Sequence, residues 1–205
     1  IGDHVFNIPI LASAMDAVVS PAFATTMHEA GGLGVLNLEG IYTRYPDPYS
    51  ILEELTSAPQ EEVTSMLQRV YSEDIKEELI GECVHQVKKT GAICAVSVTP
   101  QNTKRFSPTA VEAGADVVVV QSTVTTARHM SRSYRGLVFS ELRHSIKVPV
   151  LVGNCVTYGA SLELMETGID GVLVGVGPGA ACTTREVVGV GVPQVSATLE
   201  CAAAR

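Results

Sequence analysis

Six short apolar runs, each continuous rather than alternating, constrain the fold of this chain more than any other feature of its sequence. They are rich in β-branched and aliphatic residues, as is typical of strands that are buried on both faces of a parallel sheet. The runs cover residues 8–14, 33–37, 93–98, 117–120, 148–152 and 171–175. They predict an α/β fold with parallel strands.

Helical segments with clear end signals separate these runs. Ser20 and Pro21 provide an N-cap residue and a proline at the first helical position, and Gly31 and Gly32 stop the helix that follows. Stops of the same kind recur at residues 90–92, 113–116 and 167–170, and the last two share the phrase x-Gly-x-Asp before an aliphatic run. Repeated β/α units of this kind predict right-handed crossover connections.

The longest connection, residues 41–89, carries helical patterns at 49–56, 61–71 and 75–89. The charges of each helix gather on one face. This pattern favours a helical insertion that forms a solvated surface subdomain, or an extended crossover. A partner-binding role is the alternative.

Polar residues cluster where the predicted strands end, which distinguishes a barrel from an open sheet. A rim built from many strand ends favours a β/α barrel with its site on the carboxyl-end face, whereas a doubly wound sheet has its site at one switch point. The rim consists of Ser13, Asn37, Ser97, Thr99, Gln121, Ser122, Asn154 and the glycine-rich loop after Gly175. Because such a barrel closes with eight strands, residues 1–205 are predicted to form a partial barrel with about six of them. We expect the natural polypeptide to continue for at least two more β/α units.

The acidic composition of the chain argues against partners that carry a high negative charge. A net charge of −8 argues against a nucleic-acid polymer or an anionic membrane surface, although backbone N–H groups can still hold the phosphate of a single nucleotide. No apolar stretch is long enough to span a bilayer. The five cysteines include no CxxC pair and no zinc spacing, which favours reduced thiols in a cytoplasm.

The glycine-rich segment 174–185 carries the candidate chemistry. Gly175, Gly177 and Gly179 allow a sharply turned backbone, and Cys182 follows them together with two threonines. A cysteine on a mobile loop over a barrel mouth is placed for nucleophilic attack on a bound substrate. The alternative is an ordinary strand-end turn with a small buried cysteine.

Residues 177–185, followed by 189–194, closely resemble the catalytic loop of the IMP dehydrogenase/GMP reductase family. Residues 13–16, 31–35 and 153–157 are similar to the family's first-, second- and fifth-strand motifs, so the resemblance covers nearly the whole chain in order. The nearest branch consists of IMP-dehydrogenase-related proteins without the paired regulatory CBS domains. Residues 41–89 occupy the place of those domains.

The resemblance implies a (β/α)8 TIM barrel that oxidises IMP to XMP with NAD. Cys182 would attack C2 of the purine, hydride would pass to NAD, and water oriented by Thr184 would release XMP from the covalent intermediate. The implied substrate contacts are Ser13, Met15, Asn154, Gly179 and Ala180. The implied cofactor contacts are Gln121, Ser122, Gly175, Val176 and Gly177. Backbone carbonyls of Gly177, Gly179 and Cys182 would hold potassium, and the protein would be a cytoplasmic homotetramer.

Two departures from the family pattern keep alternatives open. Ala180 replaces the usual serine that holds the phosphate, and Gln121 replaces the usual aspartate that contacts a ribose. One alternative is a GMP reductase that uses NADPH, since residues 198–201 are similar to that branch. The other is a non-catalytic regulatory protein that binds purine nucleotides.

The roles of three arginines and of Cys155 are predicted from their neighbours in the sequence. Arg128, Arg132 and Arg135 are read as a solvated helix face, with a contact to cofactor phosphate as the alternative. Cys155 is read as a packing residue.

Overall fold

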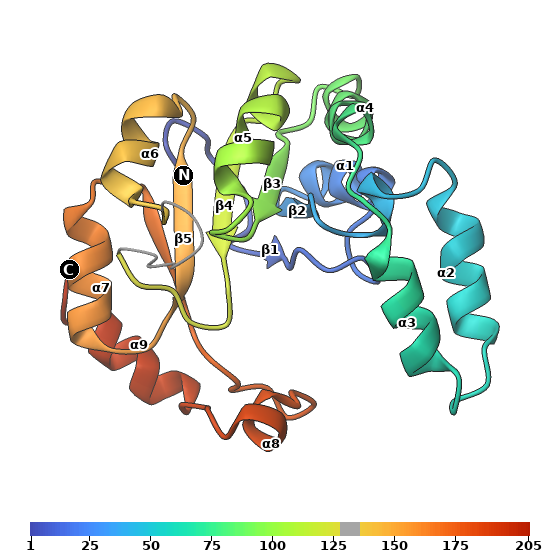
Figure 1. The fold of residues 1–205 in the computed structure, drawn as a ribbon. Coiled ribbons are helices and arrows are strands. Elements are labelled where there is room, and N and C mark those ends of the chain that lie inside the picture. The colour runs from blue at the N-terminus through green and yellow to red at the C-terminus, as the bar shows by residue number, and fades with distance from the viewer. Residues whose placement is uncertain (128–135) are drawn as a thin grey trace. The chain divides into compact units, whose positions relative to one another are not determined.

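A computed structural model describes residues 1–127 and 136–205 of the chain (Figure 1). The chain divides into two compact units, each with its own parallel strands and buried core. The amino-terminal unit consists of Val5–Val98 and Arg105–Asp116. The carboxyl-terminal unit consists of Ile1–His4, Thr99–Lys104 and Val117–Arg205.

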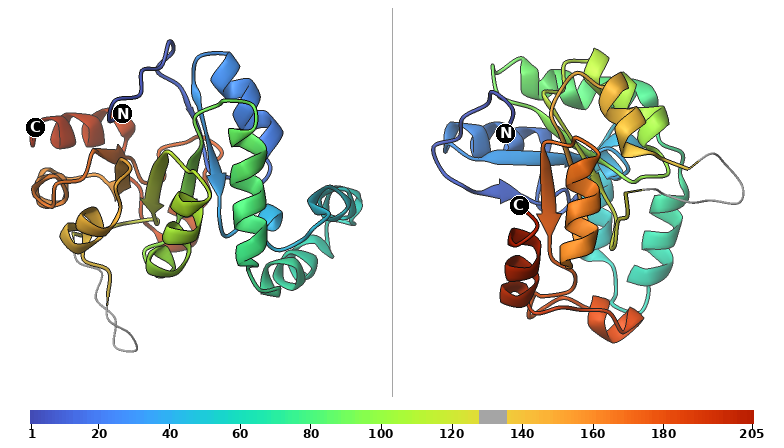
Figure 2. Two further views of the ribbon diagram at one scale, coloured as in Figure 1. Left: turned by 90° about the horizontal axis from the view of Figure 1, so that it is seen from above. Right: turned by 90° about the vertical axis from the view of Figure 1, so that its left-hand side faces the viewer.

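The amino-terminal unit has three parallel strands. β1 (Leu11–Ala12) pairs with β2 (Leu33–Asn37), and β2 pairs with β3 (Ala95–Val98). Its helices are α1 (Pro21–Glu29), the short 3-10 helix η1 (Ile41–Thr43), α2 (Pro48–Ser57), α3 (Val63–Ser72), α4 (Glu77–Lys88) and most of α5 (Thr103–Glu112). Helices α2 and α3 lie side by side (Figure 2).

The core of this unit forms because β2 and β3 are buried on both faces, as their continuous apolar sequences predict. Helix α1 begins as expected, with the Ser20 hydroxyl accepting from the Phe23 N–H at 3.0 Å. It packs closely on β2 because Gly34 has no side chain: a Cβ there would lie 2.8 Å from the Cα of Ala24.

The carboxyl-terminal unit also has three parallel strands. β4 (Val117–Gln121) pairs with β5 (Val150–Cys155), which pairs with β6 (Gly171–Val174). Its helices are α6 (Phe139–Ser145), α7 (Tyr158–Glu166), α8 (Thr184–Val188) and α9 (Gln194–Ala202). Phe139 of α6 and Leu164 of α7 are fully buried in its core.

The repeated x-Gly-x-Asp phrase has the same role in each unit. In the amino-terminal unit the Asp116 carboxylate accepts from the Cys94 N–H at 2.7 Å and from Lys88 Nζ at 2.7 Å. In the carboxyl-terminal unit Asp170 accepts from the Val150 N–H at 2.8 Å and lies 3.3 Å from Nε of Arg143. Each aspartate therefore anchors a helix to the start of a strand.

All six predicted strands are present, and the differences in their bounds have local causes. β1 begins only after Pro9, which has no N–H to donate to a ladder, and it ends at Ala12, two residues before the predicted bound. β3 begins at Ala95 because the Cys94 N–H is taken by Asp116. β5 begins after Pro149 for the same reason as β1 and continues to Cys155.

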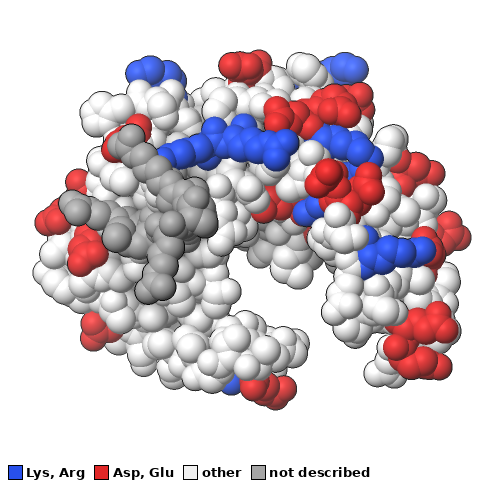
Figure 3. All heavy atoms as spheres, in the orientation of Figure 1, with Lys and Arg blue, Asp and Glu red and all other residues white. Residues whose placement is uncertain are grey.

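The predicted helices of residues 41–89 are present as α2, α3 and α4. Acidic side chains lie over the connection between α2 and α3, with basic ones nearby (Figure 3). The assignment of this segment as a replacement for regulatory domains stays a prediction. Within residues 1–127 and 136–205, no helix combines the length and the apolar character needed to cross a bilayer.

Candidate functional site

Cys182 lies on the loop between β6 and α8, with its side chain only half-buried. Its Sγ is 3.3 Å from Oγ1 of Thr184, and its N–H donates to the Gly179 carbonyl at 3.2 Å. Hydrogen bonding to the side chain and backbone of Thr184 lowers the pKa of the Cys182 thiol, and the positive charge of Arg185 lowers it further. An accessible cysteine with a lowered pKa has the character of a nucleophile.

Arg185, which the sequence analysis did not assign, holds this loop together. Its guanidinium donates one hydrogen bond to the Gly177 carbonyl and a second, 3.3 Å long, to the Gly179 carbonyl. A Cβ at Gly191 would lie 2.2 Å from Cγ of Arg185, so only glycine leaves room for the arginine side chain there. Arg185 is the last residue of the segment 177–185 that resembles the family's catalytic loop. Its place in that segment was the one feature of the sequence that could have indicated its role.

Two of the three carbonyls predicted to hold potassium are therefore already engaged. Those of Gly177 and Gly179 both accept from the cationic Arg185 side chain. A potassium ion on these two oxygens would lie against the guanidinium charge, so the arrangement does not fit the ion. Potassium at this loop stays a prediction from the resemblance alone.

The ends of β4 and β5 meet the beginning of the same loop. The Asn154 side-chain amide donates to the Gly175 carbonyl at 2.9 Å, and the Asn154 N–H donates to the Ser122 carbonyl at 3.1 Å. Gln121, the last residue of β4, is paired in register with Gly153. The structure thus brings together four residues predicted to contact substrate or cofactor: Gln121, Ser122, Asn154 and Gly175.

Gln194 fixes the start of the loop from α9. Its Nε2 donates to the Val174 carbonyl at 3.1 Å, and a Cβ at Gly175 would lie 2.6 Å from its Oε1. Val176 is buried, and its carbonyl accepts from the Val192 N–H at 3.0 Å. Gln194 ends the segment 189–194 that resembles the family loop, but its role was not predicted from the sequence.

Ser13 and Met15 belong to the amino-terminal unit, on the turn that follows β1. Both side chains are exposed, as contacts to a ligand require, whereas the next residue, Asp16, is buried. The Asp16 carboxylate accepts from the Ile41 N–H at 2.9 Å, from the Tyr71 hydroxyl at 2.5 Å and from Nδ2 of Asn37 at 3.4 Å. Asp16 was quoted only as part of a motif, and its partners are too distant in sequence to be foreseen.

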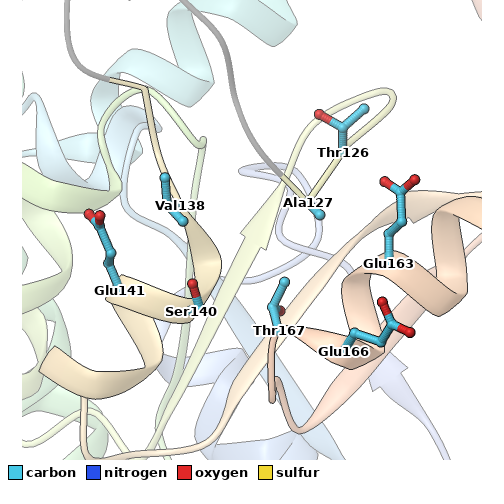
Figure 4. A pocket seen from close by; sticks show the side chains of 8 residues that line it. All are labelled: Thr126, Ala127, Val138, Ser140, Glu141, Glu163, Glu166 and Thr167. Atoms are coloured by element: carbon cyan, nitrogen blue, oxygen red, sulfur yellow. The ribbon is translucent and has the colours of Figure 1, made fainter.

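An open pocket of about 770 Å³ lies elsewhere in the carboxyl-terminal unit (Figure 4). Glu141 of α6 and Glu163 and Glu166 of α7 are the charged residues that line it. The remaining lining residues are Thr126, Ala127, Val138, Ser140 and Thr167. It contains no predicted site residue.

The other assignments from sequence have different outcomes. Arg128, Arg132 and Arg135 lie outside the described residues. Cys155 is buried beside Ser161 and Cys201, which confirms it as a packing residue. No cluster of His, Cys, Asp and Glu suited to a metal ion occurs in the described part of the chain.

Comparison with known proteins gives a consistent result. Residues 3–205 match the family described as IMP dehydrogenase / GMP reductase domain. An uncharacterized oxidoreductase of Mycolicibacterium smegmatis is 35% identical over 98% of this chain and 55% of its own length. Inosine-5'-monophosphate dehydrogenase of Cryptosporidium parvum is 31% identical over 95% of this chain and 49% of its own length. The chain thus spans about half the length of the curated relatives it matches.

Solved structures support the fold. The crystal structure of an IMP dehydrogenase/GMP reductase-like protein from Corynebacterium glutamicum matches 98% of this chain and 54% of its own, with a TM-score of 0.90 and 33% identity. This similarity confirms the predicted fold class, an α/β TIM barrel that is incomplete here. Together with the family match over residues 3–205, it shows that the chain belongs to the IMP dehydrogenase/GMP reductase family.

Proposed function

We propose that this chain carries the nucleophile and part of the nucleotide site of an NAD-dependent IMP dehydrogenase. The observation that supports this most strongly is the state of Cys182. It is accessible, contacts Thr184 at 3.3 Å, and has a pKa lowered by that threonine and by Arg185. The thiolate, which is the attacking form of a cysteine, is favoured by these neighbours.

The proposed reaction begins when the Cys182 thiolate forms a bond to C2 of IMP. The hydride on C2 then leaves with its electron pair, and a thioimidate joins Cys182 to the purine. Water next adds to C2 and the C2–S bond breaks, which leaves XMP and the Cys182 thiol. Loss of one proton from that thiol restores the thiolate. NAD would accept the hydride as the oxidant. Thr184 lies beside the sulfur and would orient the water.

The residues proposed to bind the nucleotides fit that task in different ways. Ser13 and Met15 expose their side chains to a ligand, whereas Gly179 and Ala180 would offer backbone groups. The proposed contacts to NAD are Gln121, Ser122, Gly175, Val176 and Gly177. The Ser122 hydroxyl donates to the Val124 carbonyl at 2.7 Å. Gly175 is held by Asn154.

A GMP reductase that uses NADPH is the second candidate, because it would need the same cysteine. The similarity of residues 198–201 to the reductase branch supports it. A regulatory protein that binds purine nucleotides without turnover is the third candidate, supported by Ala180 and Gln121. The lowered pKa of Cys182 speaks against the third, since binding alone needs no thiolate.

The proposal also covers the cellular compartment, the oligomeric state and the bound cation. All five cysteines are free, as is typical of a reducing compartment such as the cytoplasm. A homotetramer follows from the family resemblance, and a mass measurement in solution would test it. Potassium belongs to the same resemblance, but no step of the proposed reaction runs through it.

One pair of assays on the full-length protein tests the function. IMP with NAD should produce reduced nicotinamide and XMP, whereas GMP with NADPH should not consume NADPH. Consumption of NADPH with release of ammonia would instead establish the reductase. Nucleotide binding without either reaction would support the regulatory protein.

A further inference from the structure

The turn after β1 presents two exposed residues, Ser13 and Met15, and anchors itself through one buried residue, Asp16. Within the turn, the backbone is held by a hydrogen bond of 2.8 Å from the Met15 N–H to the Ser13 carbonyl. Beyond the turn, the side chain of Asp16 provides its anchor. The position of Ser13 and Met15 therefore depends on what holds the Asp16 carboxylate.

One of the groups that hold this carboxylate comes from the helical insertion. Tyr71 lies near the end of α3, and its hydroxyl donates to Oδ2 of Asp16 at 2.5 Å. The same oxygen accepts from the Ile41 N–H at 2.9 Å. Burial and the neighbouring Asp16 raise the pKa of Tyr71, so this hydroxyl keeps its proton and remains a donor.

The surroundings keep Tyr71 in place. The Arg44 guanidinium lies over the Tyr71 ring, with its central carbon 5.7 Å from the ring centre. Arg44 also donates to the carbonyls of Glu39 and Glu73, which fix its guanidinium. Gly40 completes the enclosure, because a Cβ there would lie 1.8 Å from Oδ1 of Asp16.

We propose that Tyr71 is a positioning residue for the nucleotide site, acting through Asp16 on the turn that carries Ser13 and Met15. The inference rests on the proposed function for the identity of the ligand. It gives residues 41–89 a third role besides a solvated subdomain or a partner surface. The insertion would hold one wall of the substrate site in its binding conformation.

The test compares two variants of the full-length protein that each remove one hydroxyl from this region. Tyr71→Phe removes the donor to Asp16. Tyr45→Phe is the matched control, because the Tyr45 hydroxyl lies in the same insertion and donates to the Val70 carbonyl at 3.1 Å. The measurements are IMP affinity by calorimetry and hydrogen exchange of the amides of residues 13–19 without ligand.

Tyr71→Phe should speed exchange of these amides and weaken IMP binding by about three- to tenfold, the effect of losing one hydrogen bond. It should leave kcat within about twofold, since the chemistry occurs at Cys182. Unchanged exchange in Tyr71→Phe, or an equal change in Tyr45→Phe, would overturn the inference. If the wild type binds no IMP, the proposed function fails, whereas the exchange result still decides the role of Tyr71.

Discussion

Replacing Asp116 with alanine tests the role assigned to the x-Gly-x-Asp phrase. The substitution removes the acceptor of the Cys94 N–H and the partner of Lys88 in one step. Cys94 is fully buried, so its N–H has no access to water as a replacement acceptor. The variant leaves this backbone donor unpaired at the beginning of β3.

The magnitude follows from the two interactions. A hydrogen bond to a charged acceptor contributes about 1.5–3 kcal/mol. The Lys88 ion pair adds at most about 1 kcal/mol, because it is partly open to water and salt. Asp116→Ala should therefore lower the free energy of unfolding by about 1.5–4 kcal/mol, a large part of a typical total of about 5–15 kcal/mol. Asp116→Asn should cost less, since an amide oxygen can still accept from Cys94.

Urea unfolding of the full-length protein measures these differences as shifts of the transition midpoint. Lys88→Met is the matched control, because it removes the ion pair and leaves the Cys94 hydrogen bond in place. Asp170→Ala should behave like Asp116→Ala, since it frees the Val150 N–H and the Arg143 side chain. The reasoning fails if Lys88→Met destabilises the protein as much as Asp116→Ala, or if Asp116→Ala costs less than about 0.5 kcal/mol.

Three further predictions concern the Cys182 loop. Cys182→Ala should abolish turnover and leave IMP affinity largely intact in calorimetry; near-normal activity would remove the cysteine from the mechanism. Thr184→Val removes the main cause of the lowered Cys182 pKa, so the pH midpoint of Cys182 alkylation by iodoacetamide should move upward; an unmoved midpoint would contradict this cause. Exchange of potassium for lithium should leave the wild-type rate within about twofold, because Arg185 already engages two of the three predicted carbonyls. The same exchange should lower the rate of the Arg185→Ala variant, whose carbonyls are free for the ion. A strong potassium dependence of the wild type would restore the cation site that the family resemblance implies.

The strands were predictable because each depends on a local pattern. Continuous apolar runs located all six, and β1, β3 and β5 begin later than predicted, after Pro9, Cys94 and Pro149, whose N–H groups are missing or engaged elsewhere. The Cys182–Thr184 contact was predictable for the same reason, since the two residues are neighbours in one motif. Short-range relations can be read from a sequence without knowledge of packing.

The anchors of the site were not predictable, because their partners are distant in the sequence. The phrase that ends in Asp116 indicates a helix stop, but nothing in it points to Lys88, which is 28 residues away. Asp16 lies inside a quoted motif, yet its bond to Tyr71 spans 55 residues. Arg185 was overlooked for another reason: its partners are backbone carbonyls, whose directions only the folded loop reveals.

The long span between Asp16 and Tyr71 has a consequence for the order in which the protein matures. During synthesis, the turn that carries Ser13 and Met15 emerges well before α3, so it cannot take up its final anchoring until Tyr71 has left the ribosome. The Cys182 loop differs, because Gly177, Gly179, Arg185 and Gly191 are made almost together. The loop of the proposed nucleophile can therefore close as soon as it is translated, while the first segment of the proposed substrate site waits for a helix made much later.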